Sequence, residues 1–405
     1  MAIRFFHTAD LHLESPFKGS YQMPKYISDE LRQSTFQAFT VLIQHAIEQR
    51  PDFILIVGDV YDGENRSLSA QYNFQQQLER LNKAEIPVII SYGNHDHLSG
   101  SWTRLQLPSN VYEFSKDVTA HRLIIRGQEV VIHGFSYEQR HIEKPMIEDY
   151  PGKQDSAIHI GMLHGSVDTD TEHAVYAPFT IPQLIEKNYD YWALGHIHKR
   201  QLLNQEPPII YPGNIQGRHR KERDAKGFYD VQIQADEVSY SFVETTQIRY
   251  MEYKIDCHEV EHAVDLLQLV EHACENLRRK YGAIMLELKL ERISQDFAKV
   301  YLEAGEEEWL QTIREQQAEQ QPFIWLHSME AELPQQNFEE SELTKQLFEK
   351  IADYTPQKLA EITADLLNQP KFAKHMERFS DSEWQQLQQE ATTNLKQYLL
   401  LEGNN

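Results

Sequence analysis

Five short motifs in this chain contain residue types that bind divalent metal ions. In chain order they are Asp10-Leu-His12, Gly58-Asp59, Gly93-Asn94-His95-Asp96, His164 in Leu-His-Gly, and Gly195-His196-Ile-His198. Each fragment alone is weak evidence, because Asp-x-His or Gly-Asp is more often a turn than a ligand pair. All five occur in order, each at the end of an apolar run. Together they predict a binuclear metal site.

The predicted ligands are carboxylate, imidazole and amide groups that divide into two sets. One ion can be held by Asp10, His12 and His198, the other by Asn94, His164 and His196, and Asp59 can bridge both. This donor mix suits Mn, our first choice, or Fe, Zn or Mg, and the absence of sulfur argues against a structural zinc or Cu(I) site. Two ions about 4 Å apart can clamp a phosphodiester and generate a hydroxide that attacks phosphorus.

One histidine in these motifs is not needed for coordination. His95 directly follows a predicted ligand, so it is placed to protonate the leaving oxygen or to stabilise its charge. For other histidines a structural place is expected: His133 and His159 in the core or on a strand face, and His97 and His219 on the surface. The sequence therefore predicts one catalytic histidine outside the ligand set.

Apolar runs rich in β-branched residues alternate with amphipathic segments in residues 1–245, as expected of a layered α/β domain. Helices are predicted over Leu31–Arg50 and Leu68–Ala84. Strands are predicted over Ile3–Phe6, Phe53–Val57, Val88–Ser91, Val130–His133, Ile158–Leu163 and Tyr191–Leu194. Every predicted ligand then follows the carboxyl end of a strand, where open α/β sheets bind ligands.

The pattern changes after residues 242–250, and a domain boundary is predicted there. Residues 251–335 indicate a small α/β domain with a helix over Glu261–Tyr281, a strand over Ile284–Glu291, a strand around Val300, a helix through Trp309 and a strand near Phe323–His327. From residue 338 to 405 the pattern is helical and rich in Gln and Glu. Three segments are therefore expected: 1–245, 251–335 and 338–405.

Composition limits the classes of protein that the chain can represent. Its 405 residues are 40% hydrophobic, which indicates a folded protein of two or three domains. No segment is long and apolar enough to cross a membrane, the N-terminal apolar run is too short for a signal peptide, and the two cysteines form no disulfide framework. A cytoplasmic setting is expected.

The net charge of −23 is unusual for a protein that acts on nucleic acid. Residues 1–250 contain 24 basic and 32 acidic side chains, a balance of −8, whereas residues 251–405 contain 15 and 30, a balance of −15. Two bound divalent ions would offset half of the −8 balance of residues 1–250. The acidity therefore lies mainly outside the predicted catalytic region.

The motif set resembles that of the calcineurin-like metallophosphoesterases. More narrowly, it resembles the SbcD-type DNA repair exonucleases and, through Gly58-Asp-Val-Tyr-Asp62 and Tyr211-Pro-Gly-Asn214, the bacterial YhaO group. The resemblance covers residues 1–245 and includes Asp96, which is expected to support the metal ligands without binding an ion. It implies a ββ sandwich flanked by helices, a smaller α/β capping domain and a helical C-terminal segment. One departure is Asp62, where archaeal and eukaryotic relatives have histidine, and this aspartate is expected to adjust the metal ligands indirectly.

The resemblance also implies partners: DNA, a second copy of the chain through helices of the catalytic domain, and a coiled-coil SbcC-like ATPase. Residues 338–402 are then the predicted ATPase-docking region, with an ordinary solvated bundle or a part of the capping domain as the alternative. A basic run that follows the last ligand could contact DNA phosphates or could be a charged turn closing a hairpin. Its cationic members are Arg218, Arg220, Lys221 and Arg223.

Three functions are compatible with these observations. The leading hypothesis is metal-dependent hydrolysis of DNA phosphodiesters by an exonuclease in repair. A small-molecule phosphodiesterase or phosphatase is the second, because site chemistry does not identify the substrate. The segment after Asp59 lacks the Asp-Arg-Gly run of the serine/threonine protein phosphatases. A non-catalytic subunit of an ATPase complex is the third, and the intact ligands and His95 argue against it.

Overall fold

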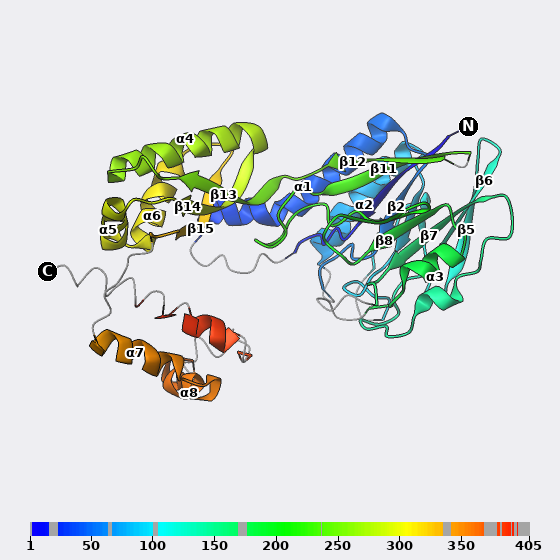
Figure 1. Ribbon diagram of the computed structural model, residues 1–405. Coiled ribbons are helices and arrows are strands. Elements are labelled where there is room, and N and C mark those ends of the chain that lie inside the picture. The colour runs from blue at the N-terminus through cyan, green and yellow to red at the C-terminus, as the bar shows by residue number, and fades with distance from the viewer. Residues whose placement is uncertain are drawn as a thin grey trace. The chain divides into compact units, whose positions relative to one another are not determined.

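The computed structural model contains two six-stranded sheets that enclose an apolar core (Figure 1). It describes residues 2–15, 23–63, 67–99, 104–168, 176–235, 237–334, 342–367, 379–380, 383–389, 391–392 and 395. In the first sheet the order is β12-β11-β1-β2-β3-β4. Its strands are β1 (Ile3–Ala9), β2 (Phe53–Val57), β3 (Val88–Ser91), β4 (Val111–Glu113), β11 (Gly227–Gln234) and β12 (Glu237–Glu244).

The second sheet has the order β5-β6-β7-β8-β10-β9. Its strands are β5 (Thr119–Ile125), β6 (Gln128–Gly134), β7 (Ile158–His164), β8 (Tyr191–Gly195), β9 (Gln201–Gln205) and β10 (Pro208–Tyr211). Side chains such as Phe5 and Leu55 from the first sheet and Ile160 from the second are fully buried in the shared core. The two sheets therefore form the layers of a sandwich, because each buries one face against the other.

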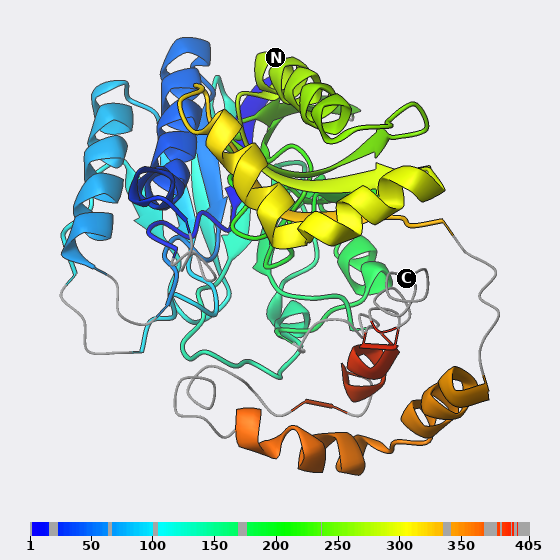
Figure 2. The same ribbon diagram turned by 90° about the vertical axis from the view of Figure 1, so that its left-hand side faces the viewer.

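Helices cover the outer face of each sheet. The helices α1 (Lys25–Gln49) and α2 (Leu68–Lys83) run side by side against the first sheet (Figure 2), where the rings of Phe39 and Phe74 stack with their centroids 5.5 Å apart. The short helix α3 (Ile181–Glu186) packs against the second sheet through Leu184. A 3-10 turn, η1 (Met146–Asp149), adds Met146 and Ile147 to the same cluster. This arrangement confirms the predicted metallophosphoesterase-like α/β fold.

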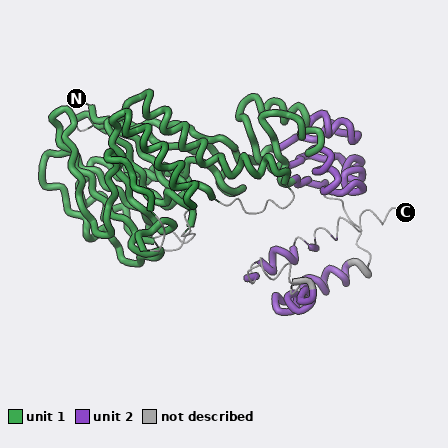
Figure 3. Tube along the Cα trace, turned by 180° about the vertical axis from the view of Figure 1, so that it is seen from behind, with its two compact units in different colours: residues 1–253, 271–288, 314–328 green, residues 254–270, 289–313, 329–405 purple. Residues whose placement is uncertain are grey.

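A three-stranded sheet follows in the sequence, with the order β13-β14-β15. It is formed by β13 (Ile248–Asp256), β14 (Ala283–Glu291) and β15 (Ile324–Ala331), and the connecting helices are α4 (Ala263–Tyr281), α5 (Gln295–Ala304) and α6 (Glu306–Gln317). The chain divides into two compact units: residues 1–253, 271–288 and 314–328, and residues 254–270, 289–313 and 329–405 (Figure 3). The predicted domain limits at 245, 251–335 and 338 stay a prediction.

The described part of the C-terminal segment is helical, as expected. It contains α7 (Glu342–Ala352), α8 (Pro356–Ile362) and α9 (Ala364–Leu367), and residues 383–389 also form a helix. Much of the predicted ATPase-docking region, including 338–341 and 368–378, lies outside the described residues. None of the helices in the described ranges is long and apolar enough to cross a membrane.

The predicted elements agree with the structure at most positions, with one clear error. β2 and β3 have the predicted bounds, and β1, β6, β7 and β8 extend the predicted strands by one to three residues. Val300, predicted in a strand, lies in helix α5. Ser294 caps that helix by accepting a hydrogen bond from the Phe297 amide, and Phe297 and Tyr301 are buried at helical spacing. The prediction missed this cap.

Candidate metal centre

The predicted ligands lie at the carboxyl ends of strands from both sheets. Asp10 and Asp59 come shortly after β1 and β2, which are parallel neighbours, and Asn94 comes shortly after β3. From the second sheet, His164 is the last residue of β7 and His196 follows β8. Parallel strands place their carboxyl ends at one edge, so these side chains meet where the two sheet edges adjoin.

The first predicted ligand set is assembled in the structure. Ligand atoms of Asp10, His12 and His198 all lie within 4.8 Å of one another. The Nε2 atoms of His12 and His198 are 3.0 Å apart. Two imidazole nitrogens at this separation either share a proton or face a common ion. Asp10 is fully buried, and its carboxylate accepts a hydrogen bond from the His196 amide at 3.1 Å.

The second predicted set is also brought together. The Asn94 Oδ1 atom lies 3.0 Å from His164 Nε2 and 3.1 Å from His196 Nδ1. Asp59 is placed between the sets, since its Oδ2 atom is 3.5 Å from His164 Nε2 and 3.7 Å from His12 Nε2. Ligand atoms of Asp10, Asp59 and His164 form a further cluster within 4.8 Å. A carboxylate in this position can face both ligand sets.

The backbone at the centre is held in an unusual conformation. Asp10, His12 and Asp59 have φ values of 52°, 43° and 48°, in the left-handed region that non-glycine residues rarely adopt. His196 has a φ of 101°. Such strain costs on the order of 1–3 kcal/mol per residue and persists only where surrounding structure fixes it. Strain at four predicted ligands marks this cluster as a functional site.

Buried negative charge dominates the electrostatics of the centre. Asp10 and Asp59 are both nearly inaccessible to solvent. The pKa of His164 is raised to about 9: its burial lowers the pKa, but the charges of Asp59 and Asp10 and the hydrogen bond to Asp59 outweigh that effect. Without an ion, the two carboxylates therefore draw a proton to His164. The same field favours a bound cation.

His95 lies beside the ligand sets and is oriented by Asp62. The His95 Nδ1 atom is 3.2 Å from Asp62 Oδ1, and Asp62 also lies 3.5 Å from His12 Nδ1. Burial raises the pKa of Asp62, but the neighbouring imidazoles of His12 and His95 and the charge of Arg218 hold it well below its usual range. Burial lowers the pKa of His95, but Asp62 and Asp59 raise it overall. A proton on His95 is thus favoured.

Asp96 stabilises the loops that carry the predicted ligands. Its carboxylate accepts hydrogen bonds from the Val60 amide at 2.6 Å and from the Gly93 amide at 2.6 Å. It thereby ties the segment after Asp59 to the segment that carries Asn94. The absence of a side chain at Gly93 is also required, since a Cβ atom there would lie 2.3 Å from Asp59 Oδ1 and 2.7 Å from His164 Nε2.

The basic run is divided between engaged and exposed side chains. Arg218 Nη1 lies 3.2 Å from Asp62 Oδ2, and Arg223 pairs with Glu252 and Glu287. Arg220 and Lys221 are exposed. The run is therefore an ordered turn in which two cations face carboxylates of the protein, and two are open to solvent.

Sequence reasoning missed Glu222, which lies inside this basic run. Its Oε1 atom is 2.6 Å from His198 Nδ1, and its side chain is 6% exposed. Burial raises the pKa of Glu222, but hydrogen bonds from His198 and His219 hold it well below its usual range. The available signal was an acidic residue flanked on both sides by cations, Lys221 and Arg223.

Of the four histidines expected to have a structural place, three lie where the sequence predicts. His133 and His159 are buried, with His133 Nε2 3.1 Å from His159 Nδ1, and His219 is exposed. His97, predicted on the surface, is only 8% exposed. Its Nδ1 atom lies 3.1 Å from Ser99 Oγ. The prediction failed because polar residues such as Asp96 and Ser99 lie near His97 in the sequence, which favoured an exposed position.

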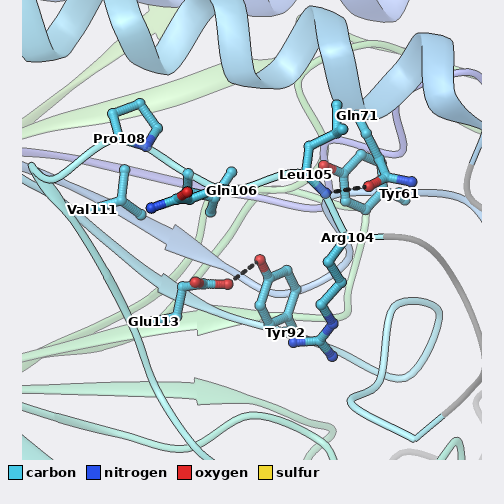
Figure 4. Close-up of a pocket in the computed structure, with 10 residues that line it drawn as sticks. Tyr61, Gln71, Tyr92, Arg104, Leu105, Gln106, Pro108, Val111 and Glu113 are labelled. Carbon is cyan, nitrogen blue, oxygen red and sulfur yellow. Dashed lines mark hydrogen bonds between the residues drawn. The ribbon is translucent and has the colours of Figure 1, made fainter.

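A cavity of about 410 Å³ is lined by several residues that are close in the sequence to predicted ligands (Figure 4). Tyr61 and Tyr92 line it, two residues from Asp59 and Asn94 respectively, and Tyr92 donates a hydrogen bond to Glu113 at 2.6 Å. None of the described residues that line this cavity is a predicted ligand. The predicted metal ligands therefore lie in the cluster of histidines and aspartates, and not around this cavity.

The donor set fits divalent metal ions. Among the described residues, carboxylates, imidazoles and one amide oxygen converge without sulfur, which is the donor chemistry of Mn, Fe or Zn sites. Two of the predicted ligand imidazoles also have their second nitrogen within reach of an oxygen: His164 Nδ1 is 3.2 Å from the Val57 carbonyl, and His198 Nδ1 is 2.6 Å from a Glu222 oxygen. Metal-ligating histidines are typically oriented in this way.

Comparison with known proteins agrees with this geometry. Residues 3–200 match the calcineurin-like phosphoesterase family. The chain is 36% identical to the uncharacterized metallophosphoesterase YhaO of Bacillus subtilis, with 98% of each chain covered. It is 26% identical to the DNA double-strand break repair protein Mre11 of Methanocaldococcus jannaschii, over 70% of this chain and 77% of that protein.

Among solved structures, the chain is similar to TT1561 of Thermus thermophilus. The TM-score is 0.32 at 10% identity, over 60% of this chain and 99% of that one. The match to YhaO extends along nearly the whole chain, and the family match includes all the predicted ligands. The chain therefore belongs to the calcineurin-like metallophosphoesterase family.

Proposed function

We propose that this protein is a metal-dependent DNA phosphodiesterase, an exonuclease acting in DNA repair. The observation that carries the proposal is the pair of ligand sets joined by Asp59, with His95 beside them and held by Asp62. The similarity to Mre11 proteins, whose names place them in double-strand break repair, supports DNA as the substrate. Phosphodiester hydrolysis needs both a charge clamp and a proton donor, and the ligand residues and His95 are suited to these two tasks.

In this proposal the ligand residues are Asp10, His12, Asp59, Asn94, His164, His196 and His198. Bound divalent ions, Mn in our proposal, would neutralise the phosphate oxygens and lower the pKa of a water molecule. His95 holds a proton near the leaving oxygen, since its pKa is raised above its ordinary value. Asp62 keeps the His95 ring in place through the 3.2 Å contact.

The DNA contacts are assigned to the exposed part of the basic turn. Arg220 and Lys221 are open to solvent and can approach phosphates. Arg218 already faces Asp62, and Arg223 faces Glu252 and Glu287, so their charges act mainly within the protein. This division predicts that only two of the four cations contribute strongly to the salt dependence of binding.

The same proposal includes assembly and location. We infer a cytoplasmic homodimer that works with an SbcC-like coiled-coil ATPase, docked on the helical segment from residue 338 onward. The described part of that segment exposes Leu347 and Ile362. Helices with exposed apolar side chains can bind a partner through a groove.

Cleavage assays with matched variants test the function. End-labelled single- and double-stranded DNA and bis-p-nitrophenyl phosphate would be incubated with Mn²⁺, Mg²⁺ or EDTA. We expect Mn²⁺-dependent shortening of DNA by the wild type. His95→Ala should retain metal and its melting curve but lose about 100-fold or more in cleavage, as for removal of a general acid. Asp59→Ala should lose metal and activity together.

The outcomes separate the candidate functions. Near-normal cleavage by His95→Ala would reject the role of that histidine. Turnover of the small diester with intact DNA would indicate a small-molecule phosphodiesterase. Metal binding with no hydrolysis of either substrate, also in the presence of an ATPase partner, would favour a non-catalytic subunit. Retention of two metal ions by Asp59→Ala would reject the bridging assignment.

A further inference from the structure

Glu222 is a buried carboxylate surrounded by hydrogen-bond donors. Its Oε2 atom accepts hydrogen bonds from Asn214 Nδ2 and from the Arg218 amide, both at 2.8 Å. Its Oε1 atom lies 2.6 Å from His198 Nδ1 and 3.2 Å from His219 Nε2. All four neighbours can donate, so both oxygens act as acceptors, as expected of an ionised carboxylate.

The contact with His198 determines which ring nitrogen carries the proton. At 2.6 Å from a carboxylate oxygen, Nδ1 must donate, because the carboxylate has no proton to give. The lone pair of neutral His198 is then on Nε2. That atom faces His12 Nε2 at 3.0 Å, within the first ligand set. The tautomer imposed at Nδ1 is therefore the one that a metal ligand needs at Nε2.

Arg218 is a weaker competitor for the same nitrogen. Its Nη2 atom lies 3.4 Å from His198 Nδ1, and a guanidinium can only donate. The two contacts require opposite tautomers of the ring. The carboxylate contact is shorter, at 2.6 Å, and Arg218 has other acceptors in Ser15 Oγ and Asp62 Oδ2 at 3.2 Å. The carboxylate therefore sets the tautomer.

We propose that Glu222 is the positioning residue that fixes the tautomer and orientation of His198 for metal binding. The inference rests on the proposed metal site, in which His198 is a ligand. Carboxylates that hold the second nitrogen of a ligating histidine contribute to metal affinity. In this chain the basic run thus contains an acid that acts on the metal site, and the exposed cations lie around it.

The variant Glu222→Gln gives a sharp test, because an amide cannot replace all the contacts of a carboxylate. Asn214 Nδ2 and the Arg218 amide can only donate, so the carbonyl oxygen of the new side chain must face them. Its NH₂ group is then turned toward His198 Nδ1, which must accept. The Arg218 guanidinium at the same nitrogen favours the same change. Glu222→Gln should therefore move the proton of His198 from Nδ1 to Nε2.

The tautomer can be read in the metal-free full-length protein by ¹⁵N NMR, with the His198→Gln variant used to assign the His198 signals. Mn²⁺ affinity would be measured separately by calorimetry. We expect an Nδ1–H ring in the wild type and an Nε2–H ring in Glu222→Gln. Mn²⁺ affinity should fall about 10- to 100-fold in that variant.

Two control variants separate positioning from simple stabilisation of the turn. Asn214→Ala removes a donor from Oε2 but leaves the Oε1 contact, so it should keep the Nδ1–H tautomer and bind Mn²⁺ with little change in affinity. Asp155→Asn removes the carboxylate that lies 2.8 Å from His159 Nε2, far along the chain from the centre, and should change neither property. Glu222→Ala serves as a second test variant and should lose the Nδ1–H preference.

Three results would overturn the inference. The first is an unchanged His198 tautomer in both Glu222→Gln and Glu222→Ala. The second is an unchanged Mn²⁺ affinity in these variants. The third is an equal loss of affinity in Asn214→Ala, which would assign Glu222 to folding of the turn alone. Failure of the wild type to bind Mn²⁺ would instead overturn the proposed metal site, and the tautomer measurement would still be valid.

Discussion

Individual side chains of the centre are held from both ends. The ring of His164 has Nδ1 at 3.2 Å from the Val57 carbonyl while Nε2 faces Asn94 and Asp59. Rings of His95 and His198 are likewise anchored by carboxylates through Nδ1. Each ring is therefore already fixed in the folded protein, so that little further rotational freedom would be lost when an ion binds nearby. Preorganisation of this kind lowers the cost of assembling the site.

Close packing of the backbone against these rings leads to a prediction for Gly93. In Gly93→Ala the added Cβ atom would lie 2.3 Å from Asp59 Oδ1 and 2.7 Å from His164 Nε2. The side chain of Asp59 or that of His164 must then move, which lowers the free energy of unfolding by about 1–3 kcal/mol. We expect lower Mn²⁺ affinity and a lower Tm. Gly152→Ala, which has open space around its Cβ position, is the matched control and should behave as the wild type.

Among the elements, the turn between β10 and β11 combines two tasks. Its buried acid contacts the metal centre, whereas Arg220 and Lys221 are exposed. Arg223 links the turn to β13 and β14 through Glu252 and Glu287. The turn is thus fixed at several points, so its exposed cations keep a defined position relative to the centre. Substitutions on its surface and in its interior should have different consequences.

The surface substitution is Arg220→Glu with Lys221→Glu. DNA affinity should fall, and the slope of log affinity against log salt should decrease by about 2, since about one counterion is released per phosphate contact. Turnover of bis-p-nitrophenyl phosphate should not change. Arg50→Glu with Lys83→Glu alters the net charge equally at exposed positions, just after α1 and at the end of α2. If both pairs weaken DNA binding to the same extent, the effect is general electrostatics, and the turn is not a contact site.

Strands and helices could be predicted where a continuous stretch of the sequence carries the whole pattern. β2 and β3 are continuous buried apolar strands, so their limits could be read to the residue. Long-range pairing could not be read in the same way: β11 joins the first sheet next to β1, with Phe5 opposite Val231. Glu222 was missed for a related reason, because a charge in a basic run appears solvated until its partner His198 is known.

On the scale of the whole molecule, the proposed ligands are divided between two sheets. Asp10, Asp59 and Asn94 come from the first sheet, and His164 and His196 from the second. A fully formed ligand cluster therefore requires that the sandwich is packed. An ion bound there would be lost on unfolding, so binding must contribute to the free energy of unfolding.

Thermal unfolding in EDTA and in Mn²⁺ tests this coupling. At a free ion concentration of about 100 times Kd, one site should add about 2.7 kcal/mol to the free energy of unfolding. We expect Tm to rise by several degrees and to increase with Mn²⁺ concentration. Asp59→Ala should show no such rise. A Tm of the wild type that is independent of Mn²⁺, together with proven binding, would contradict the division of the site between the sheets.

The left-handed backbone at Asp10, His12 and Asp59 has a consequence for protein engineering. Glycine adopts this conformation freely, so Asp59→Gly would relieve backbone strain and also remove a buried charge. That gain is opposed by the loss of the carboxylate, which accepts a hydrogen bond from the His95 amide at 2.9 Å. Burial raises the pKa of Asp59, but the charge of His164 holds it well below its usual range, so folding stabilises the charged form of this side chain. The backbone at this position favours glycine and the side-chain contacts favour aspartate, so a screen for thermostable variants would have to weigh the two, and only the aspartate can serve the proposed metal site.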